Sequence, residues 1–179
     1  LVGSERCIRD SYLPLRRFAK SEIVPSNKDR FLRKETLQGF VHDEASAFFG
    51  GLAGNAGLFS TARDVARVYQ MLLNGGEIDG QRYLSKETCQ LFTTEISKIS
   101  RRGLGFDKPD ADDPKKGNCA PAAPAEVYGH TGFTGTCAWV DPMNELVYVF
   151  LSNRIYPDVT NRKLNQLHIR ERIQGAIYD

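Results

Sequence analysis

Residues 129–151 read GHTGFTGTCAWVDPMNELVYVFL, and this stretch decides the fold of the chain. Two runs rich in β-branched and aromatic side chains, residues 136–140 and 146–151, flank an Asp-Pro-Met-Asn segment at residues 141–144. Such side chains favour strands and the segment between them favours a turn, so we predict an antiparallel β-hairpin. The His-Thr-Gly triplet at the entry to the hairpin is either a tight turn with a solvated histidine or a place where a ligand approaches the backbone closely.

The segment before the hairpin contains a helix with start and stop signals. Thr61 and Asp64 form a capping-box-like pair, and the glycine pair at residues 75–76 stands where a helix C-cap is expected. Apolar residues recur at helical spacing between these signals, at Val65, Val68, Tyr69, Leu72 and Leu73. The glycines of residues 50–57 lack the spacing of a phosphate-binding loop, so close approach of two backbones explains them better than a nucleotide site.

The other segments divide into two helices and two loops. A shorter helix is predicted to start at Ser85, with the apolar pair at residues 91–92 on its buried side. Residues 161–178 are predicted to form a C-terminal helix, because apolar residues recur among charged ones. Residues 1–40 are predicted to be extended loop with one short strand, and the proline-rich residues 107–126 to be a surface loop.

The composition is that of one soluble globular domain, with 179 residues, 41% of them hydrophobic and 26% charged. The net charge is only +2 and the basic residues are scattered, so no nucleic-acid partner is expected. No apolar run approaches the roughly 20 residues of a membrane span. The cysteines Cys7, Cys89, Cys119 and Cys137 form no Cys-x-x-Cys pair, so we expect buried free thiols, no metal and no cofactor.

Several blocks, in order, resemble the family of serine β-lactamases, penicillin-binding proteins and related esterases. Residues 129–135, Gly-His-Thr-Gly-Phe-Thr-Gly, resemble the third active-site motif, which is usually Lys-Thr-Gly and is His-Thr-Gly in some D,D-peptidases and esterases. Residues 50–66 resemble the family's segment entering the helix after the active-site loop, and residues 151–154 resemble the end of the strand after the third motif. The resemblance implies a β-lactamase/D,D-peptidase-like α+β fold, an antiparallel sheet flanked by helices, of which this chain supplies only the later half.

The sequences of residues 41–44 and 102–107 are similar to those of a Bacteroidetes subgroup of this family. His42 and Asp43 are characteristic of that subgroup and are candidate pocket residues, although a structural hydrogen bond would explain them equally well. In the subgroup the hydrolase domain often follows a family 3 glycoside hydrolase domain, so the resemblance implies a fused glycosidase domain as a partner. It also implies a location in the cell envelope or periplasm.

The resemblance assigns roles residue by residue. His130 takes the place of the motif's Lys, and the backbone N–H of Phe133 would be an oxyanion-hole donor, so these two are the catalytic candidates. Thr131, Gly132 and Asn153 are the substrate-binding candidates, with Thr131 on a carboxylate or carbonyl and Asn153 at the pocket rim. Histidine in place of lysine removes a permanent positive charge, which weakens the case for a carboxylate-bearing β-lactam and leaves an esterase or a peptidase open.

The family's nucleophile, the serine of a Ser-x-x-Lys motif, has no counterpart in the sequence. Tyr-x-Asn and Gly-x-Ser-x-Gly are absent too, and Thr160-Asn161-Arg162-Lys163 has the right spacing but lies beyond the third motif. We therefore expect residues 1–179 to be the C-terminal part of a serine hydrolase domain whose N-terminal part carries the nucleophile.

The expected parent enzyme hydrolyses an ester, amide or β-lactam in a small-molecule or peptide substrate through an acyl-enzyme, and the chain alone should be inactive. An apolar face left exposed would cause homo-oligomer formation or other association. The alternative is a catalytically dead module that binds cell-wall peptide or docks on a partner. A Ser-x-x-Lys upstream of Leu1 would favour the enzyme, and its absence would favour the module.

Overall fold

The computed structural model describes three stretches of the chain, residues 13–94, 99–113 and 117–179. The chain divides into two compact units, each described by itself below. The units are Leu1–Thr61 with Asn153–Arg162 (unit 1), and Ala62–Ser152 with Lys163–Asp179 (unit 2).

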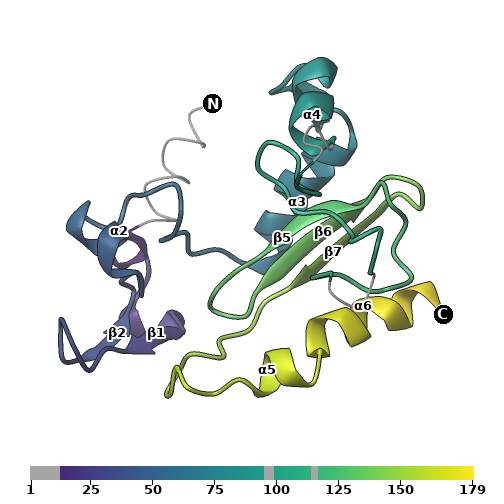
Figure 1. Cartoon of the computed structure of the whole chain (residues 1–179). Helices are drawn as coiled ribbons and strands as arrows, with labels where there is room; N and C mark the ends of the chain where they lie inside the picture. The colour runs from purple at the N-terminus through teal and green to yellow at the C-terminus, as the bar shows by residue number, and fades with distance from the viewer. Residues whose placement is uncertain (1–12, 95–98, 114–116) are drawn as a thin grey trace. The chain divides into compact units, whose positions relative to one another are not determined.

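Unit 2 is built on a three-stranded antiparallel sheet (Figure 1). Its strands, in spatial order, are β5 (Tyr128–Thr131), β6 (Cys137–Asp141) and β7 (Leu146–Phe150). The predicted hairpin is therefore confirmed as β6 and β7, and β5 adds the His-Thr-Gly segment as a third strand. The Asp141 carboxylate accepts hydrogen bonds from the backbone N–H groups of Met143, at 2.9 Å, and Asn144, at 3.2 Å, which explains why the turn forms here.

Helices cover both faces of this sheet, as Figure 1 shows. On one face Tyr148 of β7 donates through its hydroxyl to the Arg170 carbonyl of α6 (Ile169–Tyr178), at 3.1 Å. On the other face the ring of Tyr128 packs edge-on against Phe106, which packs edge-on against Tyr69 of α3 (Ala62–Leu73). The α+β class with an antiparallel sheet flanked by helices is thus confirmed.

The core of unit 2 lies on the α6 face of the sheet. It is made of buried side chains from β6, β7 and the segment before β5, namely Cys119, Val127, Cys137, Trp139 and Tyr148. The prediction that residues 107–126 are a surface loop is wrong at Asp107, Cys119 and Ala120, whereas residues such as Asp112, Ala122 and Glu126 are exposed as predicted. Asp107, Cys119 and Ala120 are all less than 3% exposed, because the segment crosses the sheet edge and closes the core.

Helix α3 begins and ends where the sequence predicts. It starts directly after Thr61, and the glycine pair follows its last turn with positive φ angles. Gly75 N–H donates to Leu72 O at 3.0 Å and Gly76 N–H to Met71 O at 2.8 Å, which satisfies carbonyls at the helix end. A two-stranded ribbon follows, formed by β3 (Glu77–Ile78) and β4 (Gln81–Arg82).

Helix α4 (Lys86–Thr93) confirms the second helix, with Ser85 as its N-cap, but its buried side was predicted wrongly. Only Cys89 is buried, whereas Leu91 and Phe92 are 52% and 43% exposed. The helix is short and has a single residue that reaches the interior, so the apolar pair lies on the outer side.

The C-terminal helix is interrupted, which the periodicity did not predict. His168 adopts a left-handed conformation between α5 (Lys163–Gln166) and α6, with φ of 48°. In α6 the buried residues are Arg170 and Gln174, while the apolar Ile173 faces outward at 42% exposure. Polar groups point inward because they have partners there: Gln174 Oε1 accepts from the Ala120 N–H at 2.8 Å.

The described residues of unit 1 contain two strands where one was predicted. Its elements are the 3₁₀ turns η1 (Pro14–Arg16) and η2 (Lys20–Glu22), the strands β1 (Pro25–Lys28) and β2 (Thr36–Gln38), and the short helix α2 (Glu44–Phe48). The strands pair antiparallel, with Lys28 opposite Thr36, and a seven-residue loop joins them. The Asp29 N–H closes the loop by donating to the Glu35 carbonyl at 2.9 Å, and the strands are too short and too polar to show a clear alternation.

Two further expectations concern the thiols and membranes. Cys89, Cys119 and Cys137 are free and buried, as predicted, and Cys7 lies outside the described residues. Burial raises the pKa of the Cys119 thiol to about 12 and that of Cys137 to about 11, which makes both poor nucleophiles. Within the three described stretches, no helix has the length and apolar character that crossing a bilayer requires.

Candidate active-site segment

Strand β5 carries the His-Thr-Gly motif along the outer edge of the sheet. Gly129 and Asp107 form an isolated antiparallel bridge on that edge, with N–H to O distances of 2.7 and 3.0 Å. Backbone groups alternate in direction along a strand, so Thr131, two residues further on, presents its N–H and carbonyl to the same edge. The bridge to Asp107 thus ends just before the motif, and the edge beside Thr131 is where a ligand backbone could pair.

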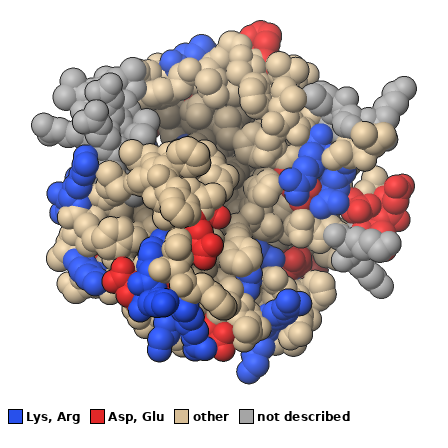
Figure 2. Space-filling view, turned by 60° about the vertical axis from the view of Figure 1, so that its left-hand side comes forward, with Lys and Arg blue, Asp and Glu red and all other residues tan. Residues whose placement is uncertain are grey.

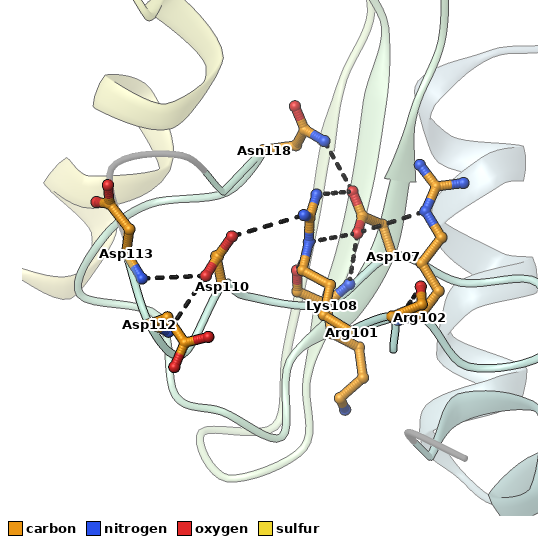
Figure 3. A network of polar contacts seen from close by, with 9 residues as sticks. Arg101, Arg102, Asp107, Lys108, Asp110, Asp112, Asp113 and Asn118 are labelled. Atoms are coloured by element: carbon orange, nitrogen blue, oxygen red, sulfur yellow. Dashed lines mark hydrogen bonds and ion pairs between the residues drawn. The ribbon is translucent and has the colours of Figure 1, made fainter. Parts of the chain in front are cut away.

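A polar network fixes the segment that makes this bridge. The Asp107 carboxylate is 1% exposed. It lies 2.8 Å from the Arg101 Nε and accepts a hydrogen bond from the Asn118 amide at 2.7 Å. Figure 3 shows the Arg101 guanidinium between the carboxylates of Asp107 and Asp110. Burial alone would raise the pKa of Asp107, but the hydrogen bonds from Asn118 and Arg101 together lower it. Asp107 is therefore a charged anchor for the edge of β5.

The His130 ring has a defined orientation. Its side chain is exposed, and Nδ1 lies 2.7 Å from the Thr131 carbonyl oxygen. A carbonyl can only accept, so Nδ1 must carry the hydrogen in this contact. In the neutral ring Nε2 is then the nitrogen without a hydrogen, and it can accept a hydrogen bond.

The glycines of the motif have a packing role. A Cβ on Gly129 would lie 2.1 Å from the Ala138 carbonyl oxygen, and a Cβ on Gly132 would lie 2.3 Å from the Thr136 hydroxyl. Gly132 N–H donates to Thr136 O at 2.8 Å, which closes the turn between β5 and β6. Close approach of the chain to itself thus accounts for both glycines without a ligand.

Phe133 lies in this turn with its ring 59% exposed. The hydroxyl of Ser152, after the end of β7, donates to the Gly135 carbonyl at 2.9 Å and so ties the same turn to the third strand. Phe133 thus sits in a braced turn next to the motif. The role of its backbone N–H as an oxyanion-hole donor stays a prediction.

His42 and Asp43 lie in unit 1. The Asp43 carboxylate caps α2 by accepting from the Ser46 N–H at 2.7 Å, and the same oxygen accepts from the Asn55 amide at 3.4 Å. The Ser46 hydrogen bond lowers the pKa of Asp43. Burial lowers the pKa of His42, an effect that the nearby Asp43 charge opposes. Asp43 therefore has a structural role, as the N-cap of α2.

An arginine that the sequence analysis did not single out fixes the backbone of this pair. Arg33 donates to the Val41 and His42 carbonyls at 2.7 and 2.8 Å, and its Nε lies 2.8 Å from the Asp29 carboxylate. The only sequence signal is the spacing of four residues between Asp29 and Arg33, which occurs too often by chance to be informative.

Asn153 also lies in unit 1, where its amide nitrogen donates to the β1 carbonyls of Pro25 and, at 3.1 Å, of Ser26. Its carbonyl oxygen accepts from the Ile155 N–H at 3.3 Å. The Asn153 amide therefore fastens the returning chain to β1, and its placement at a pocket rim stays a prediction.

The seven predicted residues thus fall into two groups. Unit 2 brings together the four motif residues, His130, Thr131, Gly132 and Phe133, while His42, Asp43 and Asn153 lie in unit 1. Among the described residues no group of three His, Cys, Asp or Glu side chains is arranged to hold a metal ion.

Comparison with known proteins identifies the family. The family profile described as "Beta-lactamase" matches residues 4–171. Proteins of Escherichia coli (strain K12), Salmonella agona (strain SL483) and Salmonella typhi, each named "Putative D-alanyl-D-alanine carboxypeptidase", are 36% identical over 135 residues. The match covers 75% of this chain and 31% of each relative, so it spans about a third of the length of these curated relatives. A match over nearly the whole chain shows the family: this chain belongs to the β-lactamase family of serine hydrolases.

Proposed function

We propose that this chain supplies one wall of a serine acyl-transfer site, and that the nucleophile is a serine in a part of the hydrolase domain that this sequence does not include. In the proposed reaction that serine attacks an ester, amide or β-lactam carbonyl, and water then hydrolyses the acyl-enzyme. The observation that carries the proposal is the His-Thr-Gly segment, with the exposed His130 ring fixed on the Thr131 carbonyl at the outer edge of β5.

A peptide is the substrate class that this edge suits best. An extended peptide can add to the edge of a sheet through main-chain hydrogen bonds, and the Thr131 N–H faces that edge beyond the Asp107 bridge. The name of the relatives, D-alanyl-D-alanine carboxypeptidase, supports a cell-wall peptide and with it a location in the cell envelope. Activity as an esterase and a fused glycosidase domain stay predictions.

In this arrangement His130 would act through Nε2. A nucleophilic serine hydroxyl, or the water that hydrolyses the acyl-enzyme, could donate to that nitrogen while Nδ1 stays on the Thr131 carbonyl. The backbone N–H of Phe133 would stabilise the oxyanion, and Thr131 with Gly132 would align the substrate.

The proposal is tested by comparing the chain with a longer protein that contains it and the preceding hydrolase segment. We expect saturable turnover of p-nitrophenyl acetate or of a D-alanyl-D-alanine peptide by the longer protein, and no turnover above buffer by the chain. A longer protein that binds the peptide but never turns it over would instead identify a binding module.

A further inference from the structure

The last residue of β1 and the loop that follows it present apolar and basic side chains together. We call residues 28–34, Lys-Asp-Arg-Phe-Leu-Arg-Lys, the basic tip. Phe31 is 84% exposed, the most exposed phenylalanine among the described residues, and Leu32 beside it is 48% exposed. The basic tip holds four Lys or Arg residues and one Asp, a formal charge of +3, which Glu35 directly after it reduces to +2. It thus combines an outward aromatic group with a surplus of positive charge.

The basic tip is held in place by its single carboxylate. The buried Asp29 side chain accepts from the backbone N–H groups of Phe31 at 2.9 Å and Leu32 at 3.0 Å. The same carboxylate pairs with the Arg33 guanidinium, which is itself bonded to the carbonyls of residues 41 and 42. Phe31 and Leu32 are therefore presented by a braced backbone, so contact with a partner would cost little ordering entropy.

Three cations of the basic tip gather at one place. Lys28, Arg30 and Lys34 line a hollow of ≈ 440 Å³ at the base of the basic tip, together with Asp29, Glu35 and Thr36. Because Asp29 is neutralised by Arg33, the carboxylates that oppose them are Glu35, which lines the hollow, and Asp158, which interacts electrostatically with Arg30. Figure 2 shows Lys and Arg side chains in the lower part of this face, with Asp and Glu side chains among them.

We propose that the basic tip docks on an anionic lipid surface, with Phe31 and Leu32 entering the interfacial layer and Lys28, Arg30 and Lys34 contacting lipid phosphates. The charge of the loop complements such a surface, and aromatic and leucine side chains favour the boundary between headgroups and acyl chains. A free inorganic anion would use the cations but would leave the two exposed apolar side chains without a role. The proposal is independent of the acyl-transfer function.

Sedimentation of the full chain with lipid vesicles tests this directly. We expect binding to vesicles that contain about one third phosphatidylglycerol, little binding to pure phosphatidylcholine, and loss of binding as salt increases. Phe31→Ser should weaken the vesicle affinity by roughly tenfold, because the ring no longer leaves water. Lys28→Gln with Arg30→Gln should weaken it by roughly 25-fold, since each cation near the surface contributes about fivefold.

Matched variants distinguish docking by the basic tip from nonspecific adsorption of the chain to vesicles. Phe48→Ser removes a phenylalanine that is 79% exposed in α2, and Arg16→Gln with Arg17→Gln removes two cations outside the tip; both should leave the affinity unchanged. Equal losses in the test and control variants, or equal binding to neutral vesicles, would overturn the proposal. The proposal would also be overturned if inorganic phosphate binds in the hollow while the chain does not bind the vesicles.

Discussion

At the residue scale the central group is His130, which has an exposed ring and one fixed contact. Its Nδ1 is held by the Thr131 carbonyl at 2.7 Å, whereas the buried core of unit 2 is made by other side chains. A side chain placed in this way can take part in chemistry without contributing much to packing, so activity and stability should respond differently to its removal.

In the longer protein we expect His130→Ala to lower kcat/KM by roughly 10²-fold, the scale for losing a positioned acid–base group, with little change in melting temperature. His130→Lys restores the motif's permanent charge and should shift preference toward substrates that bear a carboxylate. Both quantities should be measured on one preparation. If His130→Ala loses stability but keeps its rate, His130 only completes a turn.

Asp29 gives unit 1 a testable pH dependence. The Arg33 side chain and the loop N–H groups lower the pKa of Asp29 to about 2, below its ordinary value of 3.8. A carboxylate with a lowered pKa stabilises the fold above its unfolded pKa, and this contribution disappears as the pH falls from about 4 to about 2.

Asp29→Asn should therefore lower the free energy of unfolding by about 1 to 3 kcal/mol at pH 7, and by much less near pH 2. Asp79→Asn removes the partner of Arg67 in an exposed pair and should cost under about 0.5 kcal/mol at either pH. Urea denaturation at the two pH values makes the comparison. Equal losses at both pH values would show that the Asp29 charge contributes nothing.

The structure brings the four motif residues together because they are contiguous: His130, Thr131, Gly132 and Phe133 follow one another in one strand and one turn, and their roles in a site stay predictions. Arg33 could not be found from the sequence. Its role depends on the carbonyls of residues 41 and 42, and a backbone acceptor leaves no trace in the sequence.

At the scale of elements, the hairpin of β6 and β7 was predictable, because its strands are strongly apolar and its turn residues are specific. Helix α6 was predicted as a helix, but its buried side was not. The apolar Ile173 and Ile177 lie outside, because the Arg170 side chain donates to the Thr136 carbonyl and the Gln174 side chain accepts from the Ala120 N–H. Periodicity finds the apolar stripe of a helix but does not say which side the rest of the molecule covers.

The packing of β5 on β6 gives a prediction at this scale. Gly129→Ala should destabilise the chain by about 1 to 3 kcal/mol, since the added Cβ would meet the Ala138 carbonyl at 2.1 Å. Gly105→Ala is the matched control in the same unit, because nothing lies within 4 Å of a Cβ there. Thermal or urea unfolding measures both, and a Gly129→Ala variant as stable as Gly105→Ala would contradict the assigned register.

At the scale of the whole molecule, the outward side of α6 bears on association. Leu167, Ile173 and Ile177 are each more than 40% exposed, although such residues are usually buried. Fold class and family could be predicted from the order of the sequence blocks. The sequence could not predict what covers this apolar stripe, because that depends on residues outside the stripe.

We expect the isolated chain to self-associate through this stripe. Ile173→Gln with Ile177→Gln should shift sedimentation toward the monomer, because burial of the two side chains no longer favours association. Val159→Gln changes a side chain of similar exposure elsewhere and should leave the association unchanged. A wild-type chain that sediments as a single monomer and melts cooperatively would contradict this prediction.

The central claim is that residues 1–179 provide the His-Thr-Gly wall of an acyl-transfer site but not its nucleophile. Covalent labelling with a fluorophosphonate, followed by peptide mass spectrometry, tests it most directly. We predict that the longer protein is labelled on one serine outside residues 1–179, that His130→Ala slows the labelling, and that the chain alone stays unlabelled. Stoichiometric labelling of any serine within residues 1–179, lost on denaturation, would contradict the account.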